Sequence, residues 1–160
     1  MSLFGNSQAV NLRSCAAMVE EVLAQLVHDV AASRMTGDPP SWIVTRGGAQ
    51  VHVLLHARGE ENFIRATAPI MHLEGRVDDR LLFRRLLELN AERLIGAAFA
   101  LEGDHVLLAA ERSTTDLDRS EVLDLVRRLE DYAVTFEVEL VHEFGGRSAG
   151  ISASPIFKKA

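Results

Sequence analysis

Histidine side chains are the groups in this sequence best suited to hold a metal ion or to act as general bases. His52 and His56 lie four positions apart, a spacing that would place both rings on one face of a helix. The residues around them alternate as in a strand, where positions four apart share a face but lie about 13 Å from each other. One zinc ion, with nitrogen ligands at ~2 Å, cannot bridge that distance. The pair therefore predicts two exposed strand histidines and no metal site.

Two further histidines stand directly before an acidic residue, at His28–Asp29 and at His142–Glu143. Both pairs fall in predicted helices, where neighbouring positions point in different directions, so neither pair is a catalytic dyad by itself. We therefore expect no catalytic residue, no metal ligand and no cofactor. An enzyme that assembles scattered His and Asp side chains across the fold is the least favoured functional alternative.

Two other segments contain groups that bind phosphate or react as a thiol in other proteins. The glycine-rich stretch FGGRSAG (residues 144–150) follows a predicted helix and lacks the Gly-Lys-Ser/Thr sequence, so we predict no phosphate site there. Cys15 lies beside the apolar stripe of another predicted helix. A buried structural thiol is favoured at this position, and a reactive thiol near the helix N-terminus is the alternative.

The elements that hold these side chains begin with a helix and three strands. Apolar residues recur at steps of four and three from Leu12 to Val30, which predicts a helix that ends before Thr36–Pro40. Turn signals at Gly47-Gly48 and Gly59-Glu60 then predict an antiparallel meander. With two-residue turns, the predicted strand pairs are Val44 with Val51, Trp42 with Val53, Leu55 with Ile64, and Val53 with Ala66.

The predicted register gives the meander two different faces, because side chains alternate across a strand. One face is wholly apolar and collects Trp42, Val44, Val51, Val53, Leu55, Ile64, Ala66 and Ala68. The other face is mixed and collects Ile43, Thr45, His52, Leu54, His56, Phe63, Arg65 and Thr67. Pro69 has no N–H for a strand ladder, so we expect an edge or a bulge at that residue.

A helix, a hairpin and a last helix follow the meander. Residues 75–94 predict a helix with Asp78 as its N-cap. The hairpin over 96–111 turns at Gly103-Asp104, with Asp104 expected in left-handed backbone, and it pairs Leu101 with Val106 and Phe99 with Leu108. A capping box formed by Asp118 and Glu121 opens the last helix, which ends at Gly145-Gly146.

The composition is that of a single globular domain, with 48% hydrophobic and 25% charged residues. Residues 12–146 form the predicted domain, between a flexible segment at 1–11 and a loose tail at 147–160. The net charge of −6, with arginines and acids interleaved, argues against nucleic acid and anionic membranes as partners. Neither a signal peptide nor a membrane span is evident, and the single cysteine favours the cytoplasm.

The predicted order is αβββαββα, an α+β domain with an antiparallel sheet. A resemblance to a known family is carried by the segments LLFRRLLELNAERL, AAFALEGDHVLL, TTDLDRSEV and FGG. Through these segments the sequence resembles the YbjN-type family, bacterial proteins described as sensory transduction regulators. The resemblance covers residues 78–146, and the element order is similar to that of type III secretion chaperones. It implies a small α+β subunit, commonly a homodimer, that holds an extended segment of a partner protein and has no defined catalytic residues.

Two surfaces are therefore expected to bind protein. The mixed face of the meander supplies the candidate partner-binding residues Ile43, Leu54, Phe63 and Arg65. The helix over 75–94 is apolar over a wider arc than one core-facing stripe needs, which favours a homodimer contact. Its candidate residues are Leu82, Phe83, Leu86, Leu87 and Leu89. The expected function is a non-catalytic, chaperone-like or adaptor-like protein-binding module; a regulatory subunit that senses a small molecule or a partner's state is the alternative.

Overall fold

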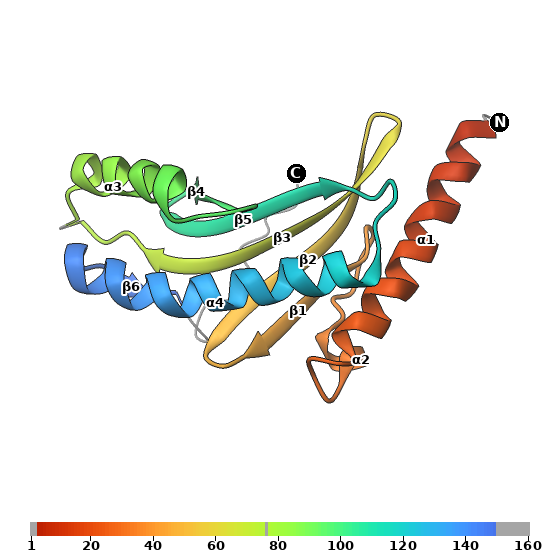
Figure 1. Cartoon of the computed structure of the whole chain (residues 1–160), viewed down its shortest axis with the longest axis horizontal. Coiled ribbons are helices and arrows are strands. Elements are labelled where there is room, and N and C mark those ends of the chain that lie inside the picture. Colours follow the sequence, from red (N-terminus) through yellow and green to blue (C-terminus); the bar gives the residue numbers. More distant parts are fainter. Residues whose placement is uncertain (1–2, 76, 150–160) are drawn as a thin grey trace.

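The computed structural model describes residues 3–75 and 77–149, and its elements follow the predicted order with two short additions (Figure 1). The additions are the helix α2 and the strand β6. The helices are α1 (Leu3–Leu23), α2 (Val30–Ser33), α3 (Asp79–Glu92) and α4 (Arg119–Phe144). The strands are β1 (Ser41–Arg46), β2 (Ala49–Arg58), β3 (Glu61–His72), β4 (Ala98–Glu102), β5 (His105–Ser113) and β6 (Arg147–Ser148).

The strands form one antiparallel sheet in the order β1-β2-β3-β5-β4, with β6 beside the end of β3. The predicted register is confirmed in every pair: Trp42 opposite Val53, Val44 opposite Val51, Val53 opposite Ala66, Leu55 opposite Ile64, Phe99 opposite Leu108, and Leu101 opposite Val106. The expected irregularity at Pro69 is a register shift between Pro69 and Met71. The local turn signals and the strict alternation were thus sufficient to set the pairing.

The apolar face of the sheet forms the centre of the core. All eight of its predicted meander residues are completely buried, and the buried apolar side chains of the three long helices belong to the same cluster. Helix α4 contributes most of the cover and packs along β2, β3 and β5 (Figure 1). The predicted N-caps are confirmed, since the Asp78 carboxylate accepts from Arg80 and Leu81, and Asp118 forms its capping box with Glu121.

Helix α1 differs from the prediction at both ends. It begins at Leu3, nine residues before the expected start, so most of the segment expected to be flexible is helical. It ends at Leu23, and after an intervening turn Asp29 takes an extended conformation and caps the separate helix α2, accepting from the Ala32 amide.

Two backbone details near the chain turns also differ from expectation. At the hairpin turn, the left-handed residue is Gly103 and not Asp104. After α4, the tail expected to be loose begins with β6, and the Ala149 amide donates to the Ile70 carbonyl. The rest of that predicted tail, residues 150–160, lies outside the described residues. Within the described parts of the chain, no helix combines the length and the apolar character that crossing a bilayer requires.

Candidate binding surface

The four predicted partner-binding residues lie on three neighbouring strands of the second sheet face. Leu54 is directly opposite Arg65, and Phe63 lies two residues before Arg65 on β3. Ile43 is on β1, opposite His52. Ile43, Leu54, Phe63 and Arg65 are all half-buried. The fold therefore brings the predicted residues together on one side of the sheet, away from the core cluster.

A cluster of charged groups that the sequence did not predict lies beside these residues. The Glu111 carboxylate on β5 is 3.1 Å from His56 Nε2, 3.5 Å from Arg58 Nη2 and 3.8 Å from Arg65 Nη1. We call His56, Arg58, Arg65 and Glu111 the β2–β3–β5 cluster. Its members come from three strands, and Glu111 joins it because β5 pairs with β3 and places Glu111 opposite Arg65.

Phe63 forms the apolar side of this cluster. Its ring stacks on the His56 ring with centroids 5.7 Å apart, and the Arg58 guanidinium lies 5.6 Å from its centre. These contacts hold two basic side chains against an aromatic face. An apolar contact surface and a group of hydrogen-bond donors thus lie side by side.

The centre of the second face is more closed than expected. His52 was predicted to be exposed, but it is only 4% exposed, and its neighbour Thr67 is also buried. The Nε2 atom of His52 lies 2.9 Å from the Gln50 side-chain oxygen. Burial lowers the pKa of His52 to about 4, so the ring is neutral at physiological pH. The charged side chains of this face therefore lie at its outer end, in the β2–β3–β5 cluster.

The candidate dimer residues on α3 are divided between the core and the surface. Leu82, Leu86 and Leu89 are buried in the core of their own chain, which corrects the expectation that they meet a second subunit. Phe83 is half-buried, and Leu87 is 68% exposed. Leu82, Leu86 and Leu89 face the core, because residues spaced by four and three positions lie on one side of a helix. Only the outer part of the predicted arc is available to a partner.

The groups considered for chemistry lie apart from one another. Among the described residues, no three His, Cys, Asp or Glu side chains are grouped so that they could hold a metal ion. Cys15 is buried, and this burial raises the pKa of its thiol, which disfavours the reactive thiolate.

One motif was overlooked in the sequence: residues 146–150 read Gly-Arg-Ser-Ala-Gly, which fits the G-x-S-x-G pattern of hydrolase nucleophiles. In those enzymes the serine sits on a sharp turn between a strand and a helix. Ser148 instead belongs to β6, which follows α4, and its hydroxyl donates to the Glu137 carboxylate. The local structure is therefore not that of a nucleophile elbow.

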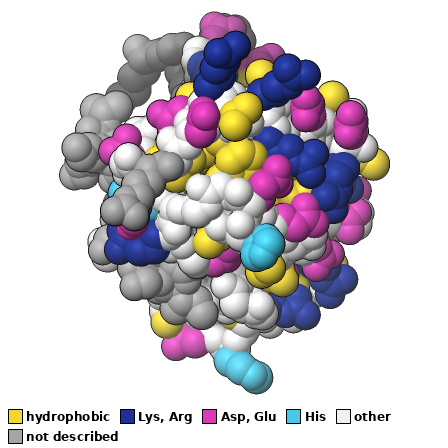
Figure 2. All heavy atoms as spheres, turned by 90° about the vertical axis from the view of Figure 1, so that its left-hand side faces the viewer, with side chains coloured by type: hydrophobic (Ala, Val, Ile, Leu, Met, Phe, Trp, Pro, Cys, Tyr) yellow, Lys and Arg dark blue, Asp and Glu magenta, His cyan; other side chains and the backbone are white. Residues whose placement is uncertain are grey.

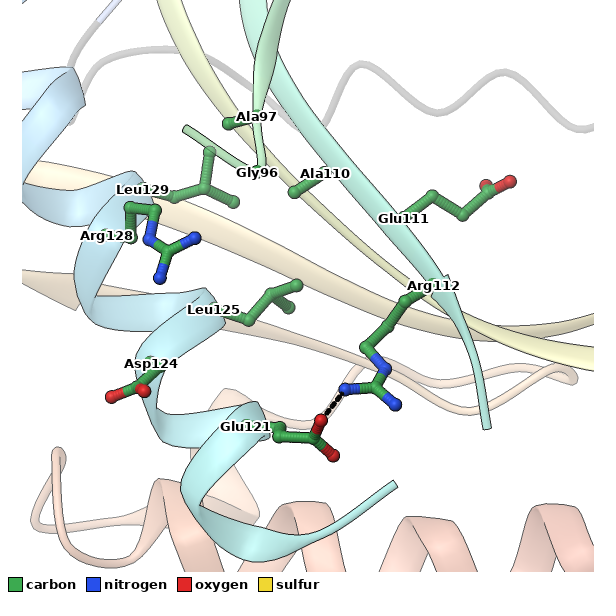
Figure 3. A pocket seen from close by; sticks show the side chains of 10 residues that line it. All are labelled: Gly96, Ala97, Ala110, Glu111, Arg112, Glu121, Asp124, Leu125, Arg128 and Leu129. Atoms are coloured by element: carbon green, nitrogen blue, oxygen red, sulfur yellow. Dashed lines mark ion pairs between the residues drawn. The ribbon is translucent and has the colours of Figure 1, made fainter. Parts of the chain in front are cut away.

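A hollow of about 320 Å³ lies between α4 and β5, next to the segment that leads into β4 (Figure 3). Leu125 and Leu129 line its apolar side. Its two arginines already have partners within the chain: Arg112 pairs with Glu121, and Arg128 donates to a backbone carbonyl of the neighbouring loop. A site that senses a small molecule would need several polar groups that converge on the hollow and are not already bonded within the chain.

Charged side chains of both signs are intermixed at the end of the molecule where α3 begins and α4 ends (Figure 2). Hydrophobic side chains lie between them. This mixture agrees with the interleaved charges of the sequence and does not form the concentrated basic patch that phosphate backbones require.

The comparison with protein families gives one match that spans most of the chain. The family is described as T3SS (YopN, CesT) and YbjN peptide-binding chaperone 1, and it matches residues 13–150. A search of curated protein sequences found no match.

Several solved structures share the fold at low sequence identity. A chain of the ExsC–ExsE complex is similar with a TM-score of 0.62 and 14% identity over 79% of this chain and 93% of that chain. The type III secretion chaperone SycH of Yersinia pestis, in complex with a fragment of YscM2, is similar with a TM-score of 0.50 and 20% identity over 76% of this chain and 98% of that chain. A chain of the ExoU–SpcU heterodimer from the type III secretion system of Pseudomonas aeruginosa is similar with a TM-score of 0.51 and 12% identity over 65% of this chain and 85% of that chain.

Proposed function

The chain belongs to the family of T3SS (YopN, CesT) and YbjN peptide-binding chaperones, and on this premise we propose that it holds an extended segment of a partner protein on the second face of its sheet. The membership confirms the resemblance predicted for residues 78–146. The secretion-chaperone-like α+β fold predicted from the element order is also confirmed.

The observation that carries the proposal is the composition of the second sheet face. Leu54 and Phe63 are half-buried, so part of each apolar side chain still contacts water. Arg65 is close to both: it is directly opposite Leu54 and two residues after Phe63 on β3. Covering the apolar parts supplies affinity, while fixed polar groups select the partner.

An extended segment matches the spacing of side chains on this face. Side chains on one side of a strand repeat every two residues, at about 6.8 Å. A segment in the same conformation presents its own alternate side chains at that spacing, so successive side chains meet Phe63 and Arg65 in turn. Ile43 on β1 extends the apolar surface across the sheet.

We further propose that the protein acts without catalysis, as a homodimer in the cytoplasm. The single cysteine, which is buried, suits a reducing compartment. The dimer is supported by the distribution of exposed apolar residues: of the eight large ones among the described residues, four lie on α3, β4 and the loop between them. These four are Leu81, Leu87, Ile95 and Leu101.

Phe63→Asp tests the proposed surface. We expect wild-type protein to enrich binding peptides from a displayed library of random sequences, and the enriched peptides to bind at least ~10-fold more weakly to Phe63→Asp, because a carboxylate replaces the apolar contact. Fluorescence anisotropy with the labelled peptides measures the affinity. Val138→Asp is the matched control, since Val138 is an exposed apolar residue on α4.

Circular dichroism melting establishes that both variants fold. Equal affinity for wild type and Phe63→Asp would reject this face as the binding surface. Failure of the folded wild-type protein to enrich any peptide would reject the proposed function itself.

A further inference from the structure

The β2–β3–β5 cluster contains more hydrogen-bond donors than its single carboxylate uses. Glu111 accepts a hydrogen bond from the neighbouring His56 ring at 3.1 Å. The nearest nitrogens of Arg58 and Arg65 lie 3.5 Å and 3.8 Å from the carboxylate, within ion-pair range. Among the described residues, neither guanidinium forms a hydrogen bond. Each guanidinium has five N–H donors, so this cluster is equipped to receive a second anion.

The charge of the cluster also favours an acidic partner. Two guanidinium groups face one carboxylate, and the His56 ring lies beside them. Glu61 lies opposite Arg58 in the register but makes no ion pair with any basic group of the described chain. A carboxylate that arrives from outside therefore meets two guanidinium groups that share one ion-paired carboxylate.

The neighbouring side chains restrict where such a carboxylate stands in the partner. Phe63 and Arg65 lie two positions apart on β3, and Leu54 is directly opposite Arg65 on β2. A partner segment in extended conformation places its residues i and i+2 about 6.8 Å apart on one side. One of these residues can cover the apolar surface of Leu54 and Phe63 while the other reaches the guanidinium groups.

We propose that this surface selects extended segments in which an apolar residue and an acidic residue are separated by one position, with the acidic carboxylate bound by Arg58 and Arg65. The inference rests on the proposed function, because it specifies the chemistry of the segment that the second sheet face holds. The Glu111 carboxylate keeps the two arginines in place and competes with the incoming carboxylate for them.

The experiment uses three displayed peptide libraries mixed in equal amounts. Every peptide carries a leucine, followed two positions later by Glu, Gln or Lys, within otherwise random neutral residues. Wild-type protein is expected to enrich the Glu library, and an enriched peptide is expected to bind about tenfold more tightly than its Glu→Gln counterpart in fluorescence anisotropy. This preference should shrink at 1 M salt, where the screening length is about 3 Å.

Variants of the cluster should move the preference in opposite directions. Arg58→Gln and Arg65→Gln reduce the affinity for the Glu peptide by a clearly larger factor than the affinity for the Gln peptide. Glu111→Gln raises the affinity for the Glu peptide, because the competing carboxylate is gone. Arg84→Gln is the control of equal charge change, since Arg84 lies on α3, where it pairs with Glu88.

Equal enrichment of the three libraries, or enrichment of the Lys library, would overturn the inference and leave the proposed function standing. The inference is likewise overturned if Arg65→Gln weakens the binding of the Glu and Gln peptides alike. If no library is enriched by the folded wild-type protein, both the inference and the proposed function fail.

Discussion

One histidine, His52, is buried on the second sheet face. His52 was predicted as an exposed strand residue because the alternation of β2 assigns it to the face away from the core. The alternation was right, since His52 opposes Ile43 and Thr67 on that face. Its burial depends on how the surrounding chain covers the centre of the face, which the spacing of residues along one strand does not encode.

We expect the burial of His52 to destabilise the folded protein in acid. The folded chain binds this proton with a pKa of about 4 and the unfolded chain with the ordinary value of 6.5, so protonation favours unfolding. As the pH falls from 7 to 4, the contribution of His52 to the free energy of unfolding should decrease by up to about 3 kcal/mol. Urea unfolding of wild type and His52→Gln across this pH range measures the difference.

His28→Gln serves as the control in that series, because His28 is exposed. Its unfolding free energy should follow that of the wild type at every pH. Parallel pH profiles for wild type and His52→Gln would show that the buried ring does not contribute the expected dependence.

At the scale of elements, helix α1 is attached to the sheet by a polar network. The Asn62 amide on β3 donates to the Gln8 carbonyl and to Asn11 Oδ1, at 3.0 and 2.9 Å. The Thr114 hydroxyl, just after β5, donates to the same Asn11 oxygen at 2.9 Å. Asn62 and Thr114 are both buried. The network therefore fixes the N-terminal half of the helix against the ends of two strands.

Asn62→Ala should release that half of α1 without unfolding the domain. The substitution removes the donor that Asn62 supplies to the Gln8 carbonyl and to Asn11 Oδ1, which keeps only the Thr114 hydroxyl of this network, at a cost of about 1–3 kcal/mol. Hydrogen exchange followed by mass spectrometry should show reduced protection in residues 8–13, with α4 as the internal reference. An equal loss of protection in α1 and α4 would contradict a local attachment.

At the scale of the whole molecule, the exposed apolar residues concentrate around α3 and the edge strand β4. One side of β4 has no strand partner within the described sheet. A two-fold contact of this region with its copy would cover Leu81 and Leu87 in both subunits at once. The buried leucines Leu82, Leu86 and Leu89 remain in the core in that arrangement and support the helix from beneath.

Leu87→Glu is expected to convert the proposed homodimer into a monomer. A charge at a self-complementary contact is repeated by symmetry and loses hydration, so the dissociation constant should rise at least ~10-fold. Gel filtration with light scattering over a range of concentrations gives the mass. Val10→Glu, on the exposed side of α1, is the matched control. A wild-type protein that is monomeric at every concentration would exclude the dimer.

The amino-acid sequence alone was enough to predict the meander, the second hairpin and their registers. It did so because two-residue turns join neighbouring strands, and because a shift of one residue would have exposed the apolar set of Trp42, Val53 and Ile64. It also determined the caps at Asp78 and Asp118, which depend on residues two or three positions away. These features arise from short-range rules that each segment obeys alone.

Contacts between residues far apart in the chain follow from the packing of the whole domain. The pairing of β3 with β5 places Glu111 opposite Arg65, although helix α3 and strand β4 lie between these two strands in the chain. The packing of α3 decided that Leu86 is buried and Leu87 exposed, although both lie in the same apolar run. Such contacts depend on all elements packing at once, because each face is buried only when its partner is in place.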